Sequence, residues 1–134
     1  MTNIFVYGTL KSGYYNHSIL GNADFLGELV IPNFKLFESG IPFMKRSENP
    51  EDKVLGELYK VSDESLVDMD RLEGHPTGYR REKVSKLLIL ESFYEDIESY
   101  IYPHDLSGMQ ESPKNSDGVY VYGQEAHVEA FGRR

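Results

Sequence analysis

The sequence predicts an α+β fold in which a curled, mixed sheet is accompanied by two helices. Its 134 residues suit one domain, and 40% of them are hydrophobic, which is enough for a packed core. About six or seven short runs are rich in β-branched and aromatic residues and are bounded by Gly, Pro and Asn. Such short strands with few helices are typical of α+β domains, so we expect a single domain over residues 1–134.

The first half of the chain is predicted to contain most of the strands and one short helix. A β-rich apolar run ends at Tyr7 and is followed by Gly8. Asn16 is a suitable cap for a short helix, which Gly21 would end. A Pro-Asn pair separates two further strands. The strands are expected at residues 4–7, 25–31, 34–37, 40–44 and 54–61.

A longer helix is predicted directly after the last of these strands. Ser62 is a good N-cap, and Asp63 and Glu64 fall in the first turn, where the helix dipole favours acidic side chains. The pattern continues to Glu73 and stops at Gly74.

The second half of the chain has weaker patterns. Strands are expected at residues 80–90 and 99–102, and one more at residues 118–122. From about residue 107 the chain is rich in Ser, Gly and acidic residues. We therefore expect residues 107–134 to form a C-terminal tail.

Glu73 lies on the apolar face of the predicted helix, where a carboxylate is unfavourable. Leu66, Met69 and Leu72 mark this face, and Glu73 shares their side of the helix. An ionised carboxylate carried toward a core costs several kcal/mol unless it is paired or hydrogen-bonded. This cost makes Glu73 a candidate general acid or base, with a pKa raised by burial.

Two alternatives to a catalytic Glu73 stay open at this level. The side chain could turn to solvent, or it could pair with Arg80 or Arg81. His75, just beyond the end of the helix, is a second candidate base.

A second candidate feature is the turn Tyr7-Gly8-Thr9-Leu10, which directly follows a strand. Gly8 permits a positive φ, and the Thr9 hydroxyl can bond a neighbouring backbone group. These traits allow consecutive N–H groups to converge on an anion, although they also suit an ordinary turn. The turn lacks the phosphate-loop and dinucleotide fingerprints, so a carboxylate or an oxyanion fits it better than a nucleotide.

Composition excludes several classes of function. A net charge of −8 opposes binding to nucleic acids and to anionic membranes. There are no cysteines, and His17, His75, His104 and His127 have no metal-binding spacing, so we expect no metal. No signal peptide or membrane-spanning stretch is visible, so a cytoplasmic protein is expected, with a monomer as the default.

Several motifs in order resemble the γ-glutamylcyclotransferase-like family, and most of all its γ-glutamylamine cyclotransferase and AIG2-like branch. They extend over residues 3–102, and the tail beyond residue 107 diverges from the family pattern. The resemblance implies a small mixed β-barrel with flanking helices. The motifs are Val6-Tyr7-Gly8-Thr9-Leu10-Lys11, Asn16-His17, Gly40-Ile41-Pro42, Gly56-Glu57-Leu58-Tyr59, Met69-Asp70-Arg71-Leu72-Glu73-Gly74 and Tyr79-Arg80-Arg81.

The resemblance also implies an activity and a role for each matching residue. Glu73 would be the catalytic acid/base, and Tyr7, Gly8, Thr9 and Leu10 would hold the γ-glutamyl group. Ile41, Pro42 and Tyr79 would complete the substrate pocket. The implied reaction releases 5-oxoproline and a free amine from a γ-glutamyl amine or amino acid, without a cofactor. The alternative is a non-catalytic module that binds a small carboxylate or peptide in the same pocket.

Overall fold

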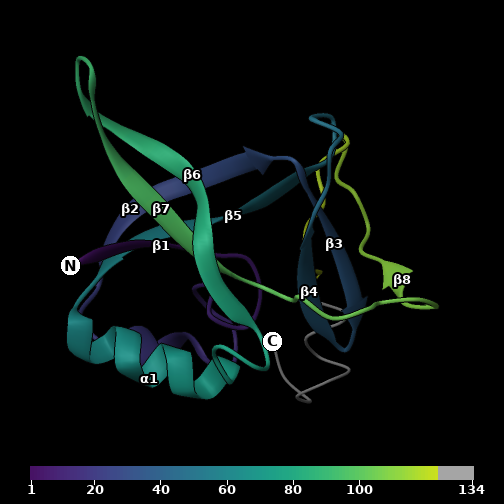
Figure 1. Cartoon of the computed structure of the whole chain (residues 1–134), viewed down its shortest axis with the longest axis horizontal. Helices are drawn as coiled ribbons and strands as arrows, with labels where there is room; N and C mark the ends of the chain where they lie inside the picture. The colour runs from purple at the N-terminus through teal and green to yellow at the C-terminus, as the bar shows by residue number, and fades with distance from the viewer. Residues whose placement is uncertain (124–134) are drawn as a thin grey trace.

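The computed structural model describes residues 1–123, which form two sheets, one α-helix and one 3-10 helix (Figure 1). The helices are η1 (His17–Leu20), a 3-10 helix, and α1 (Asp63–Glu73). The strands are β1 (Thr2–Val6), β2 (Asp24–Pro32), β3 (Phe34–Ser39), β4 (Ile41–Arg46), β5 (Lys53–Val61), β6 (Arg80–Leu90), β7 (Phe93–Ile101) and β8 (Gln110–Glu111).

The larger sheet has five strands in the order β2-β5-β1-β7-β6. It is mixed, because β1 runs parallel to β7 whereas the other neighbours are antiparallel. The smaller sheet has the order β4-β3-β8 and stands beside one end of the larger one (Figure 1). The predicted α+β class with a mixed sheet is confirmed, and the sheet curls into a half-barrel with α1 on one face.

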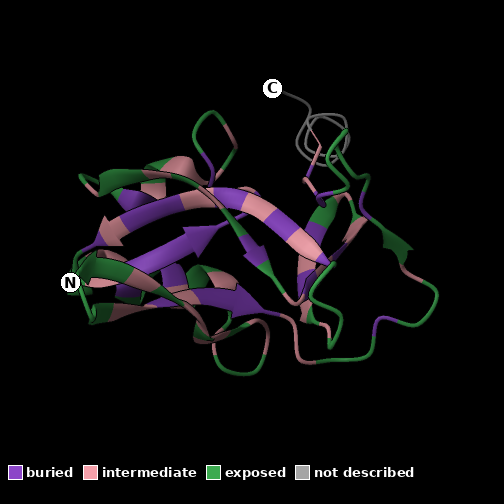
Figure 2. Cartoon of the chain, turned by 90° about the horizontal axis from the view of Figure 1, so that it is seen from above, coloured by how far each residue is buried: buried purple, intermediate pink, exposed green. Residues whose placement is uncertain are grey.

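Strand β1 and the residue that follows it, Tyr7, supply side chains to both halves of the core. Phe5 and Tyr7 pack into a cluster that joins the two sheets, whereas Ile4 and Val6 pack into a second cluster beneath α1. Successive side chains of a strand point to opposite faces, so this short run fills two cores at once. Figure 2 shows these central strands as the buried part of the molecule. The residues at the end of β1 are therefore fully packed, so the turn that follows them begins from a well-fixed position.

Helix α1 begins and ends where the sequence predicts. The Ser62 hydroxyl accepts a hydrogen bond from the Ser65 N–H at 3.1 Å, and Gly74 ends the helix with a φ of 70°. Met69 is fully buried, but Leu72 is 43% exposed, so the expectation that Leu72 belongs to the buried stripe is wrong. At 3.6 residues per turn, Leu72 lies about 60° around the helix from Met69, which leaves it at the edge of the core.

The C-terminal third differs most from the predictions. Strand β7 begins at Phe93 rather than at residue 99, because its more exposed first half pairs with β6 as a hairpin. The strand predicted at residues 118–122 is wrong, since Tyr120 makes only isolated bridges to Val54 and Lys114. Tyr120 and Tyr122 are nevertheless buried in the core. Residues 124–134 of the predicted tail lie outside the described residues.

Among the helices of residues 1–123, none has the length and apolar character needed to cross a bilayer.

We expect the substitution Met69→Ala to lower the free energy of unfolding by about 2–5 kcal/mol, because Met69 fills the seam between α1 and β1. The matched control is Val67→Ala on the same helix, where the side chain is 55% exposed and the expected change is within about 0.5 kcal/mol. Urea unfolding measures both. Equal losses of unfolding free energy in the two variants would contradict the packing of Met69 between α1 and β1.

Candidate active site

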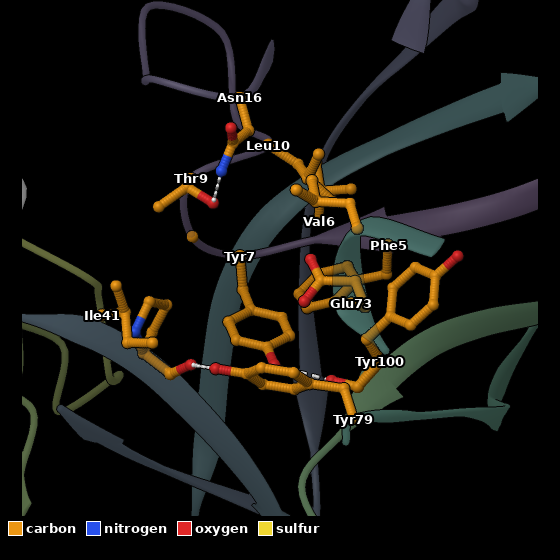
Figure 3. A pocket seen from close by; sticks show the side chains of 13 residues that line it. Phe5, Val6, Tyr7, Thr9, Leu10, Asn16, Ile41, Glu73, Tyr79 and Tyr100 are labelled. Atoms are coloured by element: carbon orange, nitrogen blue, oxygen red, sulfur yellow. Dashed lines mark hydrogen bonds between the residues drawn. The ribbon is translucent and has the colours of Figure 1, made fainter. Parts of the chain in front are cut away.

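One cavity of about 320 Å³ opens where the end of β1, the start of β4 and the end of α1 meet (Figure 3). All eight residues predicted for the site lie in its wall, and their chemical roles stay predictions. The predicted residues that line it are Tyr7, Gly8, Thr9, Leu10, Ile41, Pro42, Glu73 and Tyr79. A volume of this size suits a small ligand.

Glu73 is the last residue of α1, and its carboxylate points into the cavity between apolar side chains (Figure 3). The Glu73 side chain is partly buried. No residue within 1–123 forms a hydrogen bond or ion pair with its carboxylate. Burial raises the pKa of Glu73 to about 7. A carboxyl group near neutrality at physiological pH can both accept and donate a proton.

The backbone around Glu73 is held by the turn that follows the helix. The Tyr79 N–H donates to the Glu73 carbonyl at 3.0 Å. A Cβ on Gly78 would lie 2.8 Å from the same carbonyl oxygen, so only glycine fits there without a shift. The turn thus closes tightly under the helix end and fixes the direction of the last residue.

The structure directs the neighbouring arginines and His75 away from Glu73. Arg81 pairs with Asp70 and Glu98, and Arg80 lies 3.7 Å from Glu82, so the alternative that Glu73 pairs with one of these arginines is not observed. His75 is absent from the cavity wall, and its Nδ1 accepts the backbone N–H of Arg81 at 3.0 Å.

The turn after β1 offers hydrogen-bond donors rather than acceptors. The carbonyls of Gly8, Thr9 and Leu10 are occupied: they accept from Lys11 N–H at 3.0 Å, from the backbone N–H of residue 16 at 2.8 Å and from the His17 ring at 2.9 Å. Among residues 1–123, the N–H groups of the same three positions have no acceptor. Three free amides at a cavity wall form a favourable environment for an anion.

Gly8 is required for a reason other than the predicted one. Its φ lies outside the left-handed region, so the positive φ that glycine permits is not used here. A Cβ at this position would instead lie 2.3 Å from Cγ of Pro42. The turn and the start of β4 can approach each other only because Gly8 has no side chain.

Two tyrosines, Tyr7 and Tyr79, form another part of the cavity wall (Figure 3). The Tyr79 hydroxyl donates to the Pro42 carbonyl at 2.6 Å, and the Tyr7 hydroxyl donates to the Tyr100 carbonyl at 2.6 Å. Burial, reinforced by the negative charge of Glu73, raises the pKa of both Tyr7 and Tyr79. Both hydroxyls therefore stay protonated and act as fixed donors that tie the walls together.

The sequence analysis missed several contributors to the site. Tyr100 lines the cavity, and only its position on the inner face of a strand could have indicated this. Asn16 was expected to cap a helix, but its Nδ2 donates to the Thr9 hydroxyl at 3.0 Å instead. Tyr122, from the predicted tail, is fully buried and donates to the Gly40 carbonyl at 2.6 Å, beside one wall of the cavity.

Within residues 1–123, no three His, Cys, Asp or Glu side chains gather in a group that could hold a metal ion.

Comparison with known proteins adds independent evidence. A Methanocaldococcus jannaschii protein provisionally named a gamma-glutamylcyclotransferase is 37% identical over 121 residues, which cover 87% of this chain and 98% of that protein. The gamma-glutamylaminecyclotransferase of Rattus norvegicus is 37% identical over 90 residues, or 60% of each chain. The crystal structure of a Mus musculus AIG2-like protein matches with a TM-score of 0.68 and 25% identity, covering 93% of this chain and 97% of that one.

The family model described as "Gamma-glutamyl cyclotransferase, AIG2-like" matches residues 4–125, which include the whole cavity wall. This match and the structural likeness confirm the resemblance and the fold that it implied. The chain belongs to the γ-glutamyl cyclotransferase, AIG2-like family.

Proposed function

We propose that this chain is an active γ-glutamylcyclotransferase that converts a γ-glutamyl amine or γ-glutamyl amino acid into 5-oxoproline and the free amine. The observation that carries the proposal is that Glu73 and the free amides of residues 8–10 line the same cavity. Glu73 has no hydrogen-bond or ionic partner among the described residues, and its pKa is raised to about 7. The names of the relatives support the reaction class.

The reaction suits this small set of groups because the substrate carries its own nucleophile. The α-amine can reach the γ-carbonyl carbon and close a five-membered ring, so the new C–N bond forms within one molecule. Well-oriented intramolecular attack can supply roughly 7–11 kcal/mol of the barrier. The protein must then fold the substrate, move one proton and stabilise the charge that develops.

Glu73 performs both proton transfers in this mechanism. The ionised carboxylate takes a proton from the α-ammonium, and the neutral amine attacks the γ-carbonyl carbon. The carboxyl group then gives the proton to the departing nitrogen as the original amide C–N bond breaks. The ring nitrogen loses its second proton to the freed amine, so the products are 5-oxoproline with one N–H and an ammonium ion. A pKa of about 7 suits both directions, because neither transfer is strongly uphill.

The amides of residues 8–10 bind negative charge in the substrate. They are free donors, and they would bind the α-carboxylate or the oxyanion that forms on the γ-carbonyl oxygen. The apolar wall formed by Ile41, Pro42 and Leu72 holds the substrate chain between these donors and Glu73.

A screen of γ-glutamyl compounds tests the proposal directly. The panel contains γ-glutamyl derivatives of the lysine ε-amine, of α-amino acids and of a polyamine, and mass spectrometry follows 5-oxoproline. Formation of 5-oxoproline from at least one compound is the expected result. Binding of the panel without any ring closure would favour a non-catalytic binding module instead.

We expect Glu73→Gln to lower kcat by about 100-fold or more, because the amide keeps the shape but cannot accept the proton. The matched control is Glu64→Gln, an exposed glutamate in the first turn of the same helix, which should keep full turnover. Turnover of the Glu73→Gln variant at the wild-type rate would reject the assignment of the base.

The raised pKa of Glu73 also predicts a dependence of stability on pH. The folded state holds this proton up to about pH 7, whereas the unfolded chain releases it near about 4.3, so folding weakens as pH rises between these values. Relative to wild type, Glu73→Gln should therefore gain up to about 3 kcal/mol of unfolding free energy between pH 4 and pH 8. Urea unfolding of both proteins at a series of pH values measures this gain. A difference in unfolding free energy between them that stays constant with pH would contradict the burial of Glu73.

We expect Gly8→Ala to raise KM roughly tenfold or more, because the new methyl group would push the turn away from Pro42 and displace the free amides. Steady-state kinetics on the best substrate of the screen measures the effect. Gly123→Ala is the control, since its Cβ would meet only Pro113 Cγ, at 3.9 Å. An unchanged KM for Gly8→Ala would show that the amides do not bind the substrate.

A further inference from the structure

A charged network lies just behind the cavity and has no place in the mechanism above. Asp70 of α1, Arg81 of β6 and Glu98 of β7 meet there, each with only 22–23% of its side chain exposed. We infer that Asp70 is a positioning residue, which holds the last turn of α1 to the sheet so that Glu73 faces the free amides. This inference rests on the proposed function.

The contacts of Asp70 are those of a fixed anchor. Arg81 binds its carboxylate in bidentate fashion, with Nε at 2.9 Å from Oδ1 and Nη2 at 3.1 Å from Oδ2. The third nitrogen of Arg81 donates to Glu98 at 2.6 Å, so the guanidinium joins the helix to two strands. Bidentate arginine–carboxylate pairs are among the stronger and more directional hydrogen bonds in proteins.

Tyr100 connects this anchor to the cavity itself. Its hydroxyl donates to Oδ1 of Asp70 at 2.6 Å, its ring lines the cavity, and its carbonyl accepts the Tyr7 hydroxyl. Figure 3 shows the Tyr100 ring beside the Glu73 carboxylate. Although burial opposes it, hydrogen bonds from Arg81 and Tyr100 hold the pKa of Asp70 below its ordinary value. Asp70 thus stays charged and bound while Glu73 changes protonation state.

The end of α1 needs such an anchor because of where Glu73 lies. Glu73 is the terminal helical residue, and a helix C-terminus both frays and repels a negative charge. Asp70 is less than one turn earlier, and its carbonyl also accepts the His75 N–H at 2.9 Å. Side chain and backbone of one residue therefore fix the turn that carries Glu73. A shift of about 1 Å there can lower the rate by about 100-fold.

The substitution Asp70→Asn tests this inference, because asparagine keeps the size but loses the charge and the bidentate pair. We expect kcat to fall by about 10- to 100-fold, with KM changed less than about threefold. Asp68→Asn is the matched control: Asp68 is on the same helix, is 53% exposed and pairs with Arg71 at 3.6 Å. It should keep turnover within about twofold.

A double-mutant cycle separates positioning from general damage. If Asp70 acts through Glu73, then Asp70→Asn should cause no further loss of kcat in the Glu73→Gln background. A loss of equal size in both backgrounds would overturn the inference. If Asp70→Asn does not fold, Tyr100→Phe removes one hydrogen bond to Asp70, and a smaller, equally non-additive loss is expected.

A measurement without turnover keeps this inference separate from the proposed function. Carboxyl ¹³C NMR titration of Glu73 should show its pKa falling toward about 4.3 in Asp70→Asn, since water reaches a loosened helix end. An unchanged titration would overturn the inference. If the wild-type protein converts no γ-glutamyl compound, the proposed function fails, and the titration alone decides the role of Asp70.

Discussion

The site depends on one unfavourable feature, a carboxylate held among apolar side chains without a compensating charge. Glu73 reaches this position because it ends a helix whose other inward residues are buried against the sheet. Neighbouring arginines are directed to other acids, which leaves Glu73 without a cation. Desolvation then brings its pKa near 7, where a single group can serve as acid and base.

The rest of the cavity is built by close approach rather than by charge. Gly8 lets the turn after β1 approach Pro42, and Gly78 lets the turn after α1 pass beneath the Glu73 carbonyl. The free donors of residues 8–10 therefore lie in the same small space as the carboxylate. The overall charge of −8 does not prevent anion binding there, because amides at short range act locally and the distant surface charge is screened by salt.

Most elements and the residues around the cavity could be predicted from the sequence. Periodicity and capping placed α1 correctly, and glycine, proline and asparagine separated most strands at the observed positions. The family motifs led to eight residues that all line one cavity, although spacing by itself left the role of Glu73 undecided between catalysis and ion pairing. These features were accessible because they depend on local physics: strand alternation, helix periodicity and the conformations that turn residues allow.

Only the tertiary structure decided which contacts these residues make. The sequence could not show that Arg81 binds Asp70 and Glu98 instead of Glu73, because that choice depends on the register of β6 against β7. It could not place Tyr122 in the core, since the segment makes only isolated bridges to other segments and forms no regular strand. The helix and the turn follow from the local sequence. The shared cavity, its free amides and the raised pKa of Glu73 arise only when segments distant in sequence pack together and exclude water.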